Sequence, residues 1–268
     1  MPAPKPRRTG WHAMPTDARF LSIENVSYAY PGEGPTVNRA DLTLAPGDFH
    51  CLVGRSGCGK TTLLKLAAGL LLPTAGNVRI EGEPLTGPSQ KIGFVFQAPS
   101  LLEWQSVLDN VLLPISLHRR VRPADRHRAA ELLALVGIGD YGYRYPRQLS
   151  GGQQSRAALA RALVTAPPAL LMDEPFAALD AMTREELQDD LLRLTRKRGT
   201  TVLFVTHDIA EAAYLGTHVS MMERGRIGRT FAIDLPERHG AESRYNPRFT
   251  AICHDIRAAM GTHRGAAA

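Results

Sequence analysis

The stretch GRSGCGKT, from Gly54 to Thr61, fits the pattern G-x-x-x-x-G-K-[ST] of a phosphate-binding loop, hereafter the P-loop. It follows the apolar run FHCLV and opens KTTLLKLAAGLL, whose apolar residues keep helical spacing up to Pro73. The loop's N–H groups can cradle phosphates, Lys60 can reach the β- and γ-phosphates, and the Thr61 hydroxyl can bind Mg²⁺. We therefore expect a nucleotide site made of Gly54, Arg55, Ser56, Gly57, Cys58, Gly59, Lys60, Thr61 and Thr62.

The composition is that of a globular protein without a membrane span. The chain has 268 residues, of which 44% are hydrophobic and 22% are charged. No run approaches the ~18 apolar residues of a spanning helix, and residues 1–19 are expected to be a disordered arm, not a secretory signal. The net charge of +6 is spread along the chain, which favours solubility over nucleic-acid binding. Cys51, Cys58 and Cys253 lack C-x-x-C spacing, which favours a reducing compartment without disulfide or zinc.

Strands and helices alternate on both sides of a helical stretch. Short apolar runs broken by turn signals predict strands at 20–30, 76–82 and 91–97, and a pair of strands within 40–54 that is joined through Pro46-Gly47. Helical spacing then dominates 106–119, 123–138 and 152–166, after which strands at 169–174, 201–208 and 218–223 alternate with helices at 184–199 and 209–216. Continuous apolar strands are typical of a parallel sheet that is covered on both faces. The pattern predicts an α/β core interrupted by a helical insert.

Polar side chains end three of the predicted strands. In ALLMDE, Asp173 would hold Mg²⁺ through water and Glu174 could act as a general base, although acids at a strand end are commonly just solvated. Gln97 and His207 end two further strands, at the edge where a parallel sheet binds its ligand. Gln97 could reach Mg²⁺ or the attacking water, and His207 could contact a γ-phosphate. A lone histidine in such a place is otherwise a satisfied core or surface residue.

The stretch LSGGQ places a hydroxyl and two glycines before a helix that is rich in alanine and arginine. Free N–H groups and the positive end of the helix dipole suit an anion there. The alternative is an ordinary turn in which Ser150 caps the helix. This stretch alone leaves both interpretations open.

The P-loop, the glutamine, LSGGQ, Asp-Glu, AALD and the histidine, in this order, resemble the ATP-binding cassette (ABC) ATPases over about Leu21 to Phe231. The resemblance implies a P-loop NTPase (RecA-like) core with an N-terminal antiparallel β-subdomain and an inserted helical signature subdomain. It suggests an ATPase domain over 20–240, with the helical subdomain at about 98–160, and a C-terminal tail at 241–268.

In that family two ATP molecules are sandwiched in a head-to-tail homodimer, with Mg²⁺. The resemblance implies that the signature, Ser150, Gly151, Gly152 and Gln153, caps a γ-phosphate held by the partner's P-loop. It also implies that Asp180 crosses the dimer and that Tyr30 stacks on adenine, with Tyr28 as the competing choice. Two stretches depart from the usual family pattern. We expect the SRA that follows LSGGQQ to have little effect on phosphate contact, and the cation of Arg55 to strengthen phosphate binding slightly.

Two further stretches resemble the ATPase subunits of bacterial nitrate, sulfonate and taurine importers: FQAPSLLEWQSVLDNVLLP and the C-terminal DLPERHGAESRYNPRFTAICHDI. We expect Leu101, Leu102 and Trp104 to be exposed and to face an integral membrane permease. The alternative for Trp104 is a surface aromatic that packs beside a partner subunit. This implies a peripheral subunit on the cytoplasmic face of the inner membrane, served indirectly by a periplasmic solute-binding protein. An ATPase of export or lipid transport is the alternative.

Overall fold

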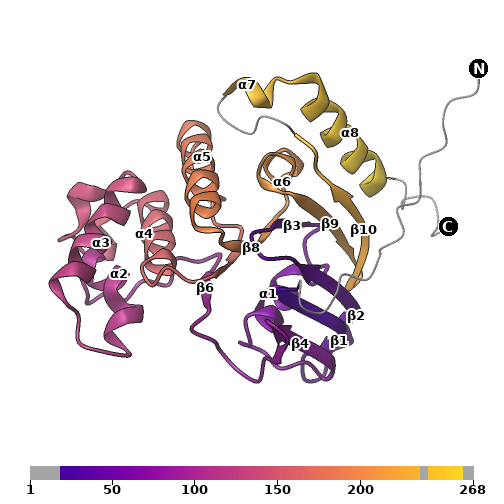
Figure 1. Cartoon of the computed structure of the whole chain (residues 1–268), viewed down its shortest axis with the longest axis horizontal. Helices are drawn as coiled ribbons and strands as arrows, with labels where there is room; N and C mark the ends of the chain where they lie inside the picture. Colours follow the sequence, from indigo (N-terminus) through magenta and orange to yellow (C-terminus); the bar gives the residue numbers. More distant parts are fainter. Residues whose placement is uncertain (1–18, 236–240, 262–268) are drawn as a thin grey trace, which may run out of the picture.

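The computed structural model describes residues 19–235 and 241–261, so the arm predicted at 1–19 lies outside the described residues except for Arg19. The described residues form two sheets (Figure 1). The larger sheet has the strand order β10-β9-β3-β8-β7-β6 and the smaller one β2-β1-β4-β5. This arrangement agrees with the predicted α/β core and its antiparallel β-subdomain.

The larger sheet is parallel over five strands. These are β3 (Phe49–Val53), β6 (Ile92–Val95), β7 (Ala169–Asp173), β8 (Thr201–Thr206) and β9 (His218–Glu223). Every residue of β3, β7 and β8 is buried, which explains why these strands read as continuous apolar runs. Their carboxyl ends share one edge, so the P-loop and the residues after β6, β7 and β8 are brought to the same side of the molecule.

The smaller sheet contains β1 (Leu21–Ala29), β2 (Pro35–Leu44), β4 (Ala75–Ile80) and the short β5 (Glu83–Pro84), all antiparallel. Its apolar side chains share a buried core with α1 (Lys60–Ala67) and with one face of the parallel sheet. Helix α1 ends before the predicted Pro73, because Gly69 turns the chain with a φ of +70°.

A helical subdomain lies to one side of the sheets and forms the left part of Figure 1. It contains α2 (Val107–Ser116), α3 (Pro123–Leu135), the 3₁₀ turns η2 (Gly139–Tyr141) and η3 (Pro146–Gln148), and α4 (Gly151–Leu163). These elements coincide with the predicted helical insert.

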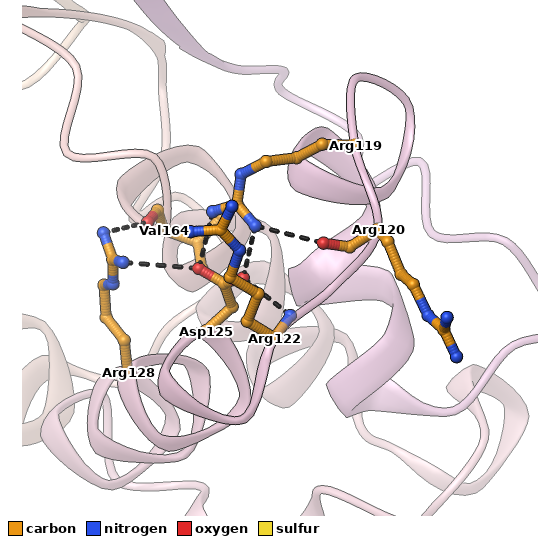
Figure 2. A network of polar contacts seen from close by, with 6 residues as sticks. All are labelled: Arg119, Arg120, Arg122, Asp125, Arg128 and Val164. Carbon is orange, nitrogen blue, oxygen red and sulfur yellow. Dashed lines mark hydrogen bonds and ion pairs between the residues drawn. The ribbon is translucent and has the colours of Figure 1, made fainter.

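Asp125 fixes the turn between α2 and α3 (Figure 2). Its buried carboxylate accepts two hydrogen bonds from the Arg119 guanidinium, at 2.6 and 2.8 Å, and one from the Arg122 N–H at 2.9 Å. Arg128 lies 3.4 Å from the same carboxylate. The Arg119 hydrogen bond holds the pKa of Asp125 well below its usual range. The aspartate is therefore charged at neutral pH and clamps the α2–α3 connection.

Helices α5 (Ala181–Arg198), α6 (Ile209–Leu215), α7 (Ala241–Arg244) and α8 (Pro247–Gly261) complete the described chain. Helix α8 packs on α6 and buries Ile256 completely, so the segment set aside as a tail contributes to the main core. Within the described residues, no helix combines the length and the apolar character that crossing a membrane requires.

Strand β10 (Arg226–Ala232), which pairs antiparallel with β9, is absent from the sequence-based prediction. The turn before it holds Arg224 and Gly225 at φ values of +47° and +78°. Two consecutive positive φ values are typical of a two-residue hairpin turn. The Arg-Gly pair was therefore the available signal for this strand.

Candidate nucleotide-binding site

The P-loop connects β3 to α1 through backbone that only glycine accommodates at two positions. A Cβ on Gly54 would lie 2.3 Å from the Met222 carbonyl oxygen, and one on Gly59 would lie 2.5 Å from the Thr36 carbonyl oxygen. Gly59 also has a φ of +104° and begins α1 without a side-chain cap. The first N–H groups of α1 are thus available to an anion.

A cavity of about 450 Å³ borders the P-loop. Its walls are Gly54–Cys58, Met221–Arg224 at the end of β9, and Met260 near the end of α8. The Gly225 N–H donates to the Cys58 carbonyl at 3.0 Å, so the β9–β10 turn braces the loop. Sequence reasoning missed this brace because it did not predict β10.

Lys60 is already directed at the loop. Its Nζ donates to the Gly54 carbonyl at 2.8 Å and to the Arg55 carbonyl at 3.1 Å, and the residue is only 7% exposed. The ammonium group is therefore held inside the loop by two of the loop's own carbonyl groups.

Thr61 and Asp173 bring two oxygens together from α1 and β7. The Thr61 hydroxyl donates to Asp173 Oδ1 at 3.1 Å, and Asp173 is 3% exposed. Burial raises the pKa of Asp173, and the hydrogen bond from Thr61 opposes that shift. A buried carboxylate beside a hydroxyl is a set of oxygen ligands that suits a hard divalent cation.

Glu174 and His207 lie together at the ends of β7 and β8. His207 Nδ1 is 3.0 Å from Glu174 Oε2, with most of the glutamate side chain buried and most of the histidine exposed. Glu174 has a φ of +46°, a backbone conformation that is strained for a residue other than glycine. Gln97 follows β6 and is exposed. The three strand-ending side chains therefore stand at one edge of the sheet, as expected.

Tyr30 lies beside α1, because its hydroxyl is 3.4 Å from Thr62 Oγ1. Tyr28 contacts the Tyr30 ring edge-on, with centroids 5.1 Å apart, and packs against the core of the smaller sheet. Tyr30 therefore has a direct polar contact with a side chain of the P-loop helix.

Ser150 caps α4. Its Oγ accepts from the Gln153 N–H at 3.3 Å, and Gln153 Oε1 accepts from the Ser150 N–H at 2.9 Å. The cap that sequence reasoning held as an alternative is thus present in the single chain. Gly151 has open space at its Cβ position. Among the described residues, no hydrogen bond or ion pair joins Ser150 to the P-loop of the same chain.

The segment between β7 and α5 lies against the signature. A Cβ on Gly152 would be 3.2 Å from Leu179 Cδ2 and 3.4 Å from the Ala178 carbonyl oxygen. Asp180 is exposed and caps α5 by accepting from the Thr183 N–H at 3.0 Å, which lowers its pKa.

The loop before α2 exposes one apolar side chain, not the three expected. Trp104 is 74% exposed, whereas Leu101 and Leu102 are partly buried, so the expectation for the two leucines was wrong. Leu101 packs on the core, and buried Asn110 holds the backbone of Leu102 through hydrogen bonds of 2.7 and 3.0 Å. The pattern of apolar residues in the sequence did not reveal these hydrogen bonds of Asn110.

The family model described as ABC transporter matches residues 37–177. This chain belongs to the ABC transporter ATP-binding family. The taurine import ATP-binding protein TauB of Chromobacterium violaceum is 41% identical over 252 residues, which cover 91% of this ABC chain and 97% of that protein. The protein of the same name from Mesorhizobium japonicum is 45% identical over 225 residues, covering 82% and 87%.

Solved ABC structures share the fold. A dimeric ATP-binding cassette in a post-hydrolysis state, bound to ADP and Pi, is 33% identical with a TM-score of 0.73, and covers 80% of this chain and 99% of that one. A second dimeric structure of a bacterial ABC transporter cassette gives a TM-score of 0.75 at 34% identity. The chain is accordingly an ATP-binding ATPase subunit of an ABC transporter.

Proposed function

We propose that this subunit hydrolyses Mg·ATP to drive the import of taurine, another sulfonate, nitrate or a related small anion. The observation that carries the proposal is the convergence of P-loop, Asp173, Glu174 and His207 at one sheet edge. The relatives named as taurine import proteins match over almost their whole length, which favours import over export or lipid transport.

Thr61 and Asp173 fit a magnesium ion, since their oxygens lie 3.1 Å apart and oxygen ligands are what Mg²⁺ prefers. We assign Thr61 as a direct ligand, Asp173 as a ligand through water and Gln97 as a further ligand. When bound, the ion neutralises phosphate charge. The amides from Gly54 to Thr62 and the Lys60 ammonium bind the phosphates, and Tyr30 stacks on the adenine.

Glu174 accepts the proton of the attacking water as general base, because its carboxylate stands at the same edge as Lys60. His207 is within 3.0 Å of this carboxylate and orients it while it faces the γ-phosphate. A carboxyl group can accept this proton only when it is ionised, so the proposed role requires Glu174 in its charged form.

The complete site needs a second copy of the chain. The signature lies on the helical subdomain and does not bond to its own P-loop within the described residues, while the related cassettes named above are dimeric. We assign the signature, from Ser150 to Gln153, to the partner's γ-phosphate, and Asp180 to the dimer contact. The cap between Ser150 and Gln153 holds the signature ready for that phosphate.

The exposed Trp104 is the best candidate for contact with the membrane permease. The buried Asn110 holds the backbone on both sides of Trp104 through hydrogen bonds to the carbonyls of Leu102, Gln105 and Ser106. This contact would hold the subunit on the cytoplasmic face of the membrane, with a periplasmic solute-binding protein acting on the other side. The domain bounds proposed are 20–240 for the ATPase domain, about 98–160 for its helical subdomain and 241–268 for the tail.

Lys60→Ala and Ser150→Arg test the two halves of the proposed site. Lys60→Ala should abolish ATP binding or hydrolysis without unfolding the chain, whereas Ser150→Arg should leave ATP binding and prevent ATP-induced dimers in size-exclusion chromatography. Wild-type hydrolysis by Lys60→Ala would refute the assignment of the P-loop.

Trp104→Ala should weaken co-purification with the permease while the affinity for ATP is unchanged. Uptake of labelled taurine into vesicles tests whether taurine is the transported solute.

A further inference from the structure

The turn that carries His207 is braced from within the protein. The Asp208 N–H donates to Thr206 Oγ1 at 3.0 Å, which closes a short ring around His207. Thr206 is buried at the end of β8, and its side chain is also hydrogen-bonded to Glu211 in the first turn of α6. Because a hydroxyl has a single proton, Thr206 accepts from Asp208 and donates to Glu211.

Glu211 extends this brace to α5. It is 8% exposed, and its Oε1 accepts from Gln188 Nε2 at 2.9 Å. Arg184, one turn earlier on α5, donates to the Leu179 carbonyl at 2.9 Å, next to Asp180. Burial raises the pKa of Glu211, while hydrogen bonds from Thr206 and Gln188 oppose that shift. One buried glutamate thus joins the turn at His207 to the helix that begins at Asp180.

A buried carboxyl is an expensive way to hold two helices together, since an apolar pair of similar size does so without desolvating a charge. Helices α5 and α6 also have a second polar contact, from the Tyr214 hydroxyl to Asp189, farther along α6 from His207. The function of Glu211 is therefore better sought at the turn it braces than in the packing of the helices.

We propose that Glu211 is a positioning residue for His207: through Thr206 it fixes the imidazole against Glu174, and through Gln188 it ties that geometry to the segment before α5. The proposal rests on the function proposed above for His207 and Glu174. Misplacement of a group by about 1 Å can cost up to ~100-fold in rate. Loss of Glu211 should accordingly lower kcat roughly 10- to 100-fold while the KM for ATP, set by the P-loop, changes little.

The test compares Glu211→Leu, Thr206→Val and Glu211→Gln in the full-length chain. Glu211→Leu and Thr206→Val should each lower kcat and shift the His207 imidazole resonance, read by NMR on histidine-labelled protein at fixed pH and assigned with His207→Gln. Glu211→Gln should retain both the rate and the resonance, because its carbonyl still accepts from Thr206. Thr206→Val decides alone if Glu211→Leu does not fold.

Tyr214→Phe is the matched control, since it removes a contact between the same helices away from His207. It should lower the melting temperature and leave kcat and the His207 resonance unchanged. If Glu211→Leu and Thr206→Val behave like Tyr214→Phe, Glu211 is only structural and the proposal is overturned. His207→Ala tests the role of His207 separately: hydrolysis by this variant at the wild-type rate would refute the role proposed for His207. The His207 resonance in Glu211→Leu and Thr206→Val would still report whether Glu211 positions the imidazole.

Discussion

Substitution of Glu174 separates the chemistry of the site from the strain of its backbone. Glu174→Gln keeps the size and the hydrogen-bonding capacity toward His207, 3.0 Å away, but removes basicity. A positioned general base contributes roughly 10²- to 10⁴-fold. At about 1.36 kcal/mol per tenfold, the barrier should rise by about 2.7–5.4 kcal/mol while ATP binding persists.

The φ of +46° at Glu174 gives a second, independent magnitude. The left-handed conformation costs a residue with a Cβ about 1–2 kcal/mol, and glycine loses about 0.5–1 kcal/mol more conformational freedom on folding than alanine. Glu174→Gly should therefore be more stable than Glu174→Ala by about 0.5–1 kcal/mol. This is the reverse of their order at an ordinary helical or extended position, and both variants should be inactive.

Phosphate-release assays measure the rates, and calorimetry at one protein concentration compares the melting temperatures of the alanine and glycine variants. For a domain of this size the difference should be about 1–3 °C in favour of glycine. Hydrolysis by Glu174→Gln at the wild-type rate would refute the assignment of the base. A glycine variant that melts below the alanine variant would refute the strain.

Three further predictions follow from packing and charge. Gly54→Ala should weaken ATP binding at least ~10-fold in calorimetric titration, because the new Cβ would lie 2.3 Å from the backbone of Met222. Gly87→Ala is the control and should have no effect, because a Cβ at that position meets nothing within 4 Å. Ile256→Ala should cost about 2–5 kcal/mol on denaturant unfolding, since this fully buried side chain leaves a cavity between α8 and α6, and a loss below 1 kcal/mol would mean that α8 is not part of the core. Because the pKa of Asp125 is lowered, its stabilisation of the fold is complete above the ordinary aspartate pKa of about 3.9 and is lost as the pH falls below that value. The melting temperatures of wild type and Asp125→Asn should therefore differ at pH 7 and converge in acid. An equal difference at all pH values would contradict a charged Asp125.

Most of the fold and of the candidate site could be predicted from short sequence motifs, for physical reasons. The P-loop glycines, the continuous apolar strands and the polar residues that end them are local in sequence, and the rule that parallel strands share a carboxyl edge converts them into one site. The choice of Tyr30 as the residue that stacks on adenine depended on the family resemblance. Its contact with Thr62 is compatible with that choice.

The features that sequence reasoning missed are individual side-chain contacts, some of them between residues only four to eight positions apart. Nothing local in the chain indicates that Asn110 holds the loop before it, or that Glu211 meets Thr206 and Gln188. Leucines 101 and 102 looked like Trp104 in the sequence, but Leu101 packs on the core and Asn110 holds the backbone of Leu102. These residues are polar partners or half-buried apolar groups, and their spacing has no characteristic period.

The hydrogen bonds that Lys60 makes to the carbonyls of Gly54 and Arg55 have a consequence for the thermodynamics of nucleotide capture. A free lysine side chain loses up to about 1.5–2 kcal/mol of rotamer entropy when it is immobilised, and here that loss is incurred during folding. ATP binding then amounts to an exchange of acceptors, in which carbonyl oxygens give way to phosphate oxygens that form stronger, charge-assisted bonds with the same ammonium group. The lysine thus contributes to affinity mainly through enthalpy, and a larger share of the entropy change of binding falls to the nucleotide and its water.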